Sequence, residues 1–377
     1  MNPTIFIAGD VVPMRRTVPQ FRERQAEALF GEMREYICGS DLRIVNLEAP
    51  IADTDTPRIR KSGPSLCCAS STLETLQMAG FNTVTLANNH FRDYGDQGVQ
   101  GTINQCKQLN INLIGGGNTA TEARRPLHIT IKHKSITIIN ACETEFSIAT
   151  QCHGGSNPLD IVQTDEDIVQ AKQRGDIVLL ILHGGVEHYQ LPTPRMRKWY
   201  RHFVDMGADA VVNHHQHCIS GYEVYKGKPI FYGIGNFCFD SFREQAIGKW
   251  NYGYAVRLTI DTKISFELIP YTQCAGRPTL ELRKYADFED EIQRLNAIIQ
   301  DEYLLEQQFN EYVLQHEKGI LGGLLPLRTK YLKGAYRRGW LGRVFTTAQV
   351  YGIKNKLVCQ SHYDVTSQLF KLLTLDN

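Results

Sequence analysis

The densest group of side chains able to do chemistry is a histidine cluster near the middle of the sequence. His214, His215 and His217 place three imidazoles within four positions. His215 and His217 are two apart, so in an extended segment they point the same way. Packing alone rarely calls for three histidines so close together, and imidazoles suit Zn, Fe or Mn. The cluster therefore predicts a metal site.

Other polar side chains follow short apolar runs that predict buried strands. These residues are Asp10, Glu48, Asn88, Asn89, His90 and His183. Taken singly, each has a plainer interpretation, such as a turn cap, a surface carboxylate, a turn asparagine or a structural histidine. The carboxyl ends of strands in an open α/β sheet converge on one crevice. We therefore expect these residues and the histidine cluster to form one shared site.

The combination of residue types suits two neighbouring ions. Carboxylates can bridge two divalent cations about 3.5–4 Å apart. Carboxylate and amide oxygens suit Mn or Mg, whereas imidazoles suit Zn, Fe or Mn. Gly184 and Gly185, directly after His183, would let the backbone approach a ligand closely. We expect one or two divalent metal ions, with Mn, Zn, Fe and Mg all open.

Predicted strands and helices alternate over the first two thirds of the chain, and these elements must position the site. The predicted strands include Ile5–Ala8, Arg43–Asn46, Thr83–Leu86, Ile136–Asn140, Ile177–Leu182 and Ala210–Val212. The predicted helices include Phe21–Ile37, Ser70–Ala79, Gln97–Leu109, Asp165–Lys172 and Pro194–Met206. Further strands between residues 222 and 269 have no helices between them. This order predicts an α/β fold, a mixed β-sheet sandwich flanked by helices.

The character of the sequence changes after about residue 280. We predict one domain over residues 1–280 and a helical C-terminal extension over 281–377, beginning with a continuous helix at Asp287–Gln315. From residue 318 to 356 there are nine lysines and arginines and no acid, interleaved with Leu, Tyr and Trp. This segment could lie on an anionic membrane surface. It could instead clamp a polyanionic substrate, or form a solvated helical pair packed on the core.

The composition of the chain indicates which partners and which cellular compartment to expect. The formal net charge is +1, so no nucleic-acid partner is expected. Ten cysteines without a CxxC pair favour reduced thiols in a cytosolic protein. The first apolar run is too short for a signal peptide, and no window reaches ~18 apolar residues. We expect a cytoplasmic protein, with peripheral contact at the inner membrane left open.

Several motifs, taken together, carry a family resemblance. They are Gly9-Asp10, Asn46-Leu47-Glu48, Leu86-Ala87-Asn88-Asn89-His90 with Asp93-Tyr94-Gly95, His183-Gly184-Gly185-x-Glu187, His214-His215-x-His217 and Gly235-Asn236-Phe237. Over about residues 4–275 the sequence resembles the bacterial capsule-synthesis proteins of the CapA or poly-γ-glutamate type. That family resembles the calcineurin-like metallophosphoesterases in fold.

The resemblance implies a role for each residue. Asp10 would bind one metal, Glu48 would bridge, Asn89 would bind the second metal, and His183, His215 and His217 would complete the two shells. His90 would serve as acid or transition-state donor, and Glu187 is the second catalytic candidate. Lys61, Asn88, His214 and Asn236 are the substrate-binding candidates, although Lys61 could also be an exposed loop lysine.

The sequence also departs from the pattern that it resembles. Val12 stands where the wider phosphoesterase superfamily has a histidine, which implies one imidazole fewer at the first metal. Glu48 replaces the usual bridging aspartate, and Gly184 replaces a tryptophan. Asn213 and Gln216 replace the glycine and proline of a Gly-His-His-Pro-His block.

The resemblance favours a metal-dependent hydrolase or transferase. Its substrate would be a capsule or exopolymer, of polysaccharide or polyglutamate type, or a carrier-linked precursor. The bond attacked could be a phosphoester or the amide of an anionic polypeptide. A non-catalytic alternative is a polymer-binding accessory protein in a capsule synthesis or export complex.

Overall fold

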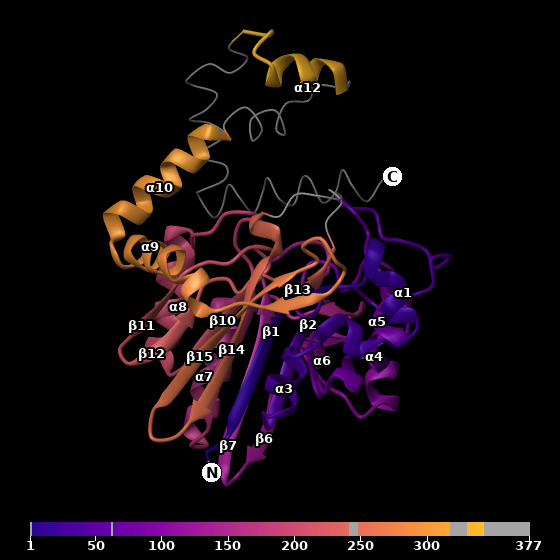
Figure 1. Ribbon diagram of the computed structural model, residues 1–377, viewed down its shortest axis with the longest axis vertical. Helices are drawn as coiled ribbons and strands as arrows, with labels where there is room; N and C mark the ends of the chain where they lie inside the picture. Colours follow the sequence, from indigo (N-terminus) through magenta and orange to yellow (C-terminus); the bar gives the residue numbers. More distant parts are fainter. Residues whose placement is uncertain (1, 62, 241–247, 317–329, 343–377) are drawn as a thin grey trace. The chain divides into compact units, whose positions relative to one another are not determined.

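The computed structural model describes residues 2–61, 63–240, 248–316 and 330–342 (Figure 1). Two compact units are present, residues 1–309 and 310–377. The first unit contains both large β-sheets and every residue proposed for the site. The domain boundary predicted near residue 280 stays a prediction.

The first large sheet has eight strands. Its spatial order is β16 (Leu280–Leu282), β15 (Ile264–Gln273), β14 (Tyr252–Ile260), β1 (Thr4–Val12), β2 (Leu42–Leu47), β3 (Thr83–Thr85) and β4 (Asn112–Ile114), with β13 (Asn236–Phe239) also paired to β1. Strands β1 to β4 and β13 run parallel to one another. The β14–β16 side is antiparallel. The sheet is therefore mixed.

The second large sheet has six strands. Its order is β11 (Tyr222–Tyr225), β12 (Lys228–Phe231), β10 (Ala210–His214), β9 (Ile177–His183), β7 (Lys134–Cys142) and β6 (Leu127–Ile131). The four central strands are parallel and the two edge strands are antiparallel. Strands β5 (Gly116–Gly117) and β8 (Gly155–Ser156) form a separate small ladder.

An apolar core joins the two sheets, as alternation along the strands requires. Ile5 and Ile7 of β1 pack in one buried cluster with Leu179 and Ile181 of β9. Phe6, between the two isoleucines, belongs to a second cluster shared with the surrounding helices. The mixed-sheet sandwich flanked by helices is thus confirmed.

Helices cover the outer faces of both sheets (Figure 1). On the first sheet these are α1 (Val18–Arg22), α2 (Ala26–Phe30), α3 (Met33–Cys38), α4 (Ser71–Ala79) and α5 (Gly95–Gln108). On the second sheet α7 (Ile161–Gln173) contacts β7 and β9, and α8 (Pro194–Met206) contacts β10 and β12. The short α6 (Ala120–Arg124) contacts β5, β7 and β8.

Two predicted helices are wrong, because the structure divides each of them into shorter helices. The helix predicted over Phe21–Ile37 is three short helices, because Arg24 and Gly31 adopt positive φ values of 58° and 44° that end each turn. The helix predicted over Asp287–Gln315 is α9 (Glu289–Gln300) followed by α10 (Glu302–Gln315). Asp301 separates them, and its carboxylate accepts a hydrogen bond from the Leu304 amide at 3.0 Å.

Most of the basic segment from 318 to 356 lies outside the described residues. Within it, α12 (Lys330–Arg337) is described, with Tyr336 buried and Tyr331 and Trp340 exposed. Among the described residues, no helix combines the length and apolar character that a membrane span needs. Membrane contact through this segment stays a prediction.

A β-bulge at Gly9 decides where the first acidic residue points. In the pairing with β2, Ala8 is opposite Val45 and Asp10 is opposite Asn46, so Gly9 is an extra residue in β1. A bulge of this kind re-aims the next side chain, and bulges are common beside active sites. Asp10 consequently faces the second sheet, as Asn46 does. A Cβ at position 9 would lie 1.9 Å from the Gly235 carbonyl oxygen, so only glycine fits there.

Gly9→Ala should therefore lower the free energy of unfolding by roughly 1–3 kcal/mol, as overpacking typically does. The new methyl group collides with backbone rather than with a flexible side chain. Urea denaturation measures the change. Gly248→Ala is the matched control, because a Cβ there meets nothing within 4 Å. Equal stability of the two variants would contradict this account of the bulge.

Candidate metal centre

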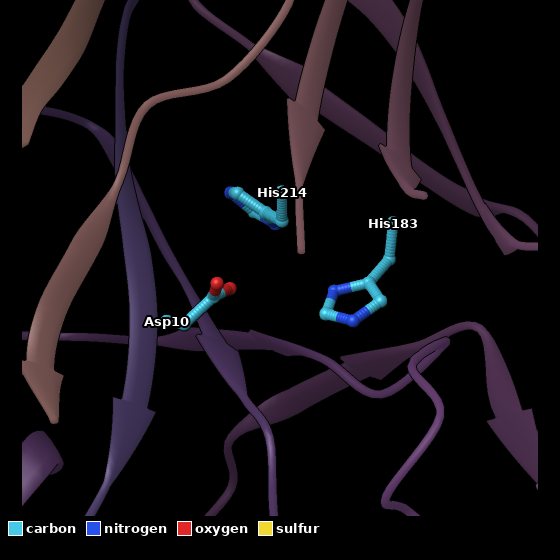
Figure 2. A group of neighbouring side chains, drawn as sticks. All are labelled: Asp10, His183 and His214. Atoms are coloured by element: carbon cyan, nitrogen blue, oxygen red, sulfur yellow. The ribbon is translucent and has the colours of Figure 1, made fainter. Parts of the chain in front are cut away.

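The strand registers bring the predicted site residues to one edge of the sandwich. Asp10 lies opposite Asn46 on β2 and Asn236 on β13. His214 lies opposite His183 in the second sheet. Figure 2 shows Asp10, His183 and His214 pointing toward a common space from three separate strands. Each residue lies at or near the carboxyl end of its strand, where the apolar core between the sheets gives way to polar side chains.

Three overlapping groups of buried side chains bring their possible donor atoms within 4.8 Å of one another. They are Asp10–His183–His214, Glu48–His183–His215 and Asp10–Glu48–His217. Glu48 belongs to two of them, and its Oε1 lies 3.5 Å from His183 Nε2 and 3.7 Å from His217 Nε2. This is the position that a ligand shared by two ions would need.

The carboxylate of Glu48 provides the clearest test of whether a cation fits. Glu48 is fully buried, and neither carboxylate oxygen has a hydrogen-bond partner among the described residues. Burial raises its pKa well above the usual value. A buried carboxylate is costly unless it is paired or coordinates a metal. The surrounding imidazole, carboxylate and amide donors are those that divalent transition metals accept, so the residues fit the implied ions.

The histidines differ in charge state. Burial, reinforced by the neighbouring His217, lowers the pKa of His215 to about 4. Burial and His215 also lower the pKa of His183 well below its usual value. Burial alone would lower the pKa of His217 too, but Glu48 and Asp10 outweigh it and raise that pKa to about 9. His183 and His215 are therefore neutral at pH 7, the form in which imidazole binds metals.

The backbone of the histidine loop is held in an unusual conformation. His215 and His217 have φ values of 88° and 54°, in a region that residues with a Cβ rarely adopt. Such conformations cost energy and gather at functional sites. Asn213, on β10, and Gln216, in the loop, are the two residues that depart from the resembled motif, and both hydrogen-bond to the backbone around the loop. Asn213 Nδ2 donates to the Gly184 and Tyr232 carbonyls, and Gln216 Nε2 donates to the Tyr189 and Leu191 carbonyls.

Two asparagines from the side of the first sheet contact histidines of the metal groups, and a third is buried nearby. Asn89 Oδ1 lies 3.1 Å from His183 Nε2, facing the metal groups. Asn236 Oδ1 lies 2.9 Å from His217 Nδ1, which leaves His217 Nε2 directed at Glu48. Asn88 is fully buried, and its Nδ2 donates to the Leu47 carbonyl at 2.9 Å. Contact of Asn88 and Asn236 with a substrate stays a prediction.

The remaining candidates lie in or around the metal groups. His214 is buried, and burial lowers its pKa, so its imidazole is neutral at pH 7 and able to bind a metal. Glu187 is exposed at the rim, where its charge contributes to raising the pKa of Glu48. His90 is 7% exposed, and its Nδ1 lies 2.7 Å from Asp93 Oδ2.

Lys61 is not an exposed loop lysine. Its side chain is 3% exposed and forms a buried ion pair with Asp93, whose side chain is fully buried. Its Nζ also lies 3.1 Å from His90 Nδ1. Lys61, His90 and Asp93 therefore form one buried cluster beside the metal groups. Contact of Lys61 with a substrate anion stays a prediction.

Sequence reasoning missed four residues of the site. Asn46 donates from Nδ2 to Asp10 Oδ1 at 2.7 Å, and its position two residues before Glu48 on a strand was the available signal. Asp93 belongs to the Asp93-Tyr94-Gly95 motif, but the sequence alone suggested no role for it. Glu143 and Glu145 follow β7, whose last residue, Cys142, lies opposite His183. The strand predicted there ended at Asn140, which hid their proximity.

Residues 4–241 match the family described as "Bacterial capsule synthesis protein PGA_cap". The chain belongs to this family.

Relatives with assigned names agree with that membership. The capsule biosynthesis protein CapA of Bacillus anthracis is 28% identical over 245 residues, 63% of this chain and 60% of that protein. The PGA biosynthesis protein CapA of Bacillus subtilis is 29% identical over 236 residues, 62% of each chain. The chain therefore spans about three fifths of the length of these relatives. A solved structure from Thermus thermophilus, described as a hypothetical protein, aligns over 71% of this chain and 99% of its own, with a TM-score of 0.44 and 13% identity.

Lys61→Met should destabilise this capsule-family protein by about 3–5 kcal/mol, because it leaves the buried Asp93 without its cation. Equilibrium unfolding in urea measures the loss. The double variant Lys61→Met with Asp93→Asn should recover part of it, since the uncompensated charge is then also removed. If the double variant were as unstable as the sum of the two single variants, the ion pair would not be the cause.

Mn²⁺ or Zn²⁺ should raise the unfolding midpoint of the wild-type protein. A ligand present at 100 times its dissociation constant stabilises the folded state by about 2.7 kcal/mol. Glu48→Gln and His183→Ala should lose most of this gain, because each removes a donor from two of the metal groups. Glu267→Gln, an exposed strand residue, should keep it. Thermal unfolding with and without the ion and EDTA makes the comparison, and an equal gain in Glu48→Gln would speak against the site.

Proposed function

We propose that this protein is a metal-dependent hydrolase or transferase that acts on a bacterial capsule polymer, an exopolymer, or a precursor of one. Its ions would be held by Asp10, Glu48, Asn89, His183, His215 and His217. The observation that carries the proposal is the Glu48 carboxylate, fully buried with both oxygens unpartnered among the described residues and two imidazole nitrogens within 3.7 Å.

The bound ions would lower the pKa of a coordinated water and polarise the oxygen of the bond under attack. The chain's own residues supply the proton. The Nδ1 of His90 faces Asp93 Oδ2 at 2.7 Å, so the proton for a leaving group would come from Nε2 of the imidazolium form, in which both ring nitrogens carry a proton. Asp93 in turn accepts from the Leu66 amide at 2.8 Å, which fixes the carboxylate and, through it, the imidazole ring.

The substrate class is supported by the family and by the names of relatives. The Bacillus relatives are named for capsule and PGA biosynthesis, and a Mycobacterium tuberculosis relative, 28% identical over 164 residues, is named a probable polyglutamine synthesis accessory protein. We propose that the polymer is anionic and that the protein works beside other capsule components. Residence in the cytoplasm and contact with the inner membrane stay predictions.

Turnover assays on three substrate classes test the proposal. Wild-type protein loaded with Mn²⁺ or Zn²⁺ should turn over a generic phosphodiester, a phosphomonoester or a γ-linked glutamate oligomer, and EDTA should abolish the activity. His90→Ala should lower the rate by about 10²–10⁴-fold while the metal content is unchanged, because it removes a proton donor rather than a ligand. Glu48→Gln should lose both metal and activity.

His153→Ala is the matched control, since His153 is an exposed histidine paired with Asp96. It should behave as wild type. Metal-loaded protein that binds the polymer tightly and cleaves none of the three substrates would refute the catalytic proposal. That result would favour the role of a polymer-binding accessory protein.

A further inference from the structure

Glu145 lies next to the metal groups although it belongs to none of them. It sits three residues beyond the end of β7, and the pairing of Cys142 with His183 places the segment beside the site. Its side chain is 39% exposed, so it borders the solvent. Three glutamates, Glu143, Glu145 and Glu187, follow strands of the second sheet. Of these, Glu143 forms an ion pair with Arg195 and accepts a hydrogen bond from the Gly185 amide.

The side chains of Asn89 and His215 lie between Glu145 and the metal groups. Each has one polar atom near His183 and another part near Glu145. Asn89 Oδ1 lies 3.1 Å from His183 Nε2, and burial raises the pKa of Glu145 while the nearby Asn89 side chain offsets part of that rise. His215 Nδ1 also lies 3.1 Å from His183 Nε2, and its other ring nitrogen, Nε2, lies 3.9 Å from Glu145 Oε1. Glu145 thus lies beside two side chains that both approach His183 Nε2, those of Asn89 and His215.

We infer that Glu145 is a positioning residue, which turns the Asn89 oxygen and His215 Nδ1 toward an ion held by Glu48, Asn89, His183 and His215. The inference rests on the proposed metal centre. A histidine that binds a metal usually donates its second ring N–H to a carboxylate or carbonyl, which fixes its tautomer and orientation. At 3.9 Å the contact with His215 is longer than a direct hydrogen bond. A small rotation of the partly exposed carboxylate would close it.

The same geometry explains why a carboxylate is needed at this position. The amide of Asn89 can present either its oxygen or its NH₂ group to the ion, and only the oxygen is a ligand. An acceptor behind the NH₂ group selects the productive orientation. His215 can likewise carry its proton on either nitrogen, and an acceptor behind Nε2 leaves Nδ1 free for the metal. Glu145 would make both selections at once.

Metal binding by Glu145 variants tests the inference. Zn²⁺ affinity is measured by chelator competition on the full chain, and the relevant ion is identified as the one lost in His215→Ala. Glu145→Ala should bind that ion about 10–100-fold more weakly, the usual effect of removing such a partner. Glu145→Gln should recover part of the loss, because its amide oxygen can still accept. Thr144→Ala, an exposed neighbour in the same segment, should bind as wild type.

A second readout separates positioning from a general effect on the loop. The ¹⁵N shifts of the His215 ring in the Zn²⁺-loaded protein should report a proton on Nε2 in the wild type and an altered ring environment in Glu145→Ala. Unchanged affinity in Glu145→Ala would overturn the inference and leave the metal centre standing. Weaker binding without any change in the His215 signals would also overturn it. A wild-type protein that binds no ion would refute the proposed function, and this inference with it.

Discussion

The rest of the site depends on one buried carboxylate, for which the described part of the chain provides no hydrogen-bond donor. Glu48 follows an apolar strand at the boundary between the two sheets, and both of its oxygens are cut off from water. Removing such a group from water costs several kcal/mol unless opposite charge compensates it. His183 and His217 approach it within 3.7 Å, and Asp10 stands near enough to raise its pKa further. A buried negative charge of this kind requires a compensating positive charge, which a divalent cation would supply.

Strand register positions part of the site, and the segments that follow the strands position the rest, including Glu48, Asn89, His215 and His217. Asp10, Asn46 and His183 lie on adjacent or facing strands whose pairing fixes each Cα, so their side chains inherit the rigidity of the sandwich. Two irregular features also contribute: the single extra residue at Gly9, which turns Asp10 inward, and the histidine loop. There, the positive φ values of His215 and His217 cost energy, and the hydrogen bonds of Asn213 and Gln216 offset that cost.

The sequence was most informative where chemistry follows directly from strand order. Polar residues at the ends of parallel strands predicted one shared edge, and the sandwich is confirmed. Contacts that depend on strand register, or that join residues far apart in the chain, could not be predicted from the sequence. The ion pair of Lys61 with Asp93 joins residues 32 positions apart across a loop. The bulge at Gly9 depends on the pairing of β1 with β2 and β13, and the breaks at Arg24 and Gly31 depend on backbone angles that apolar periodicity does not reveal.

Val12 stands where the resembled superfamily has a histidine. The structure shows which imidazoles surround Asp10 without that histidine. Val12 is fully buried in the cluster shared with the helices of the first sheet. Asp10 instead meets the imidazoles of His183 and His214, whose donor atoms lie within 4.8 Å of its carboxylate, and that of His217. Position 12 therefore serves the apolar core in this protein. The imidazoles around Asp10 all come from strands and loops of the second sheet, so both halves of the sandwich must assemble before any group of donors is complete.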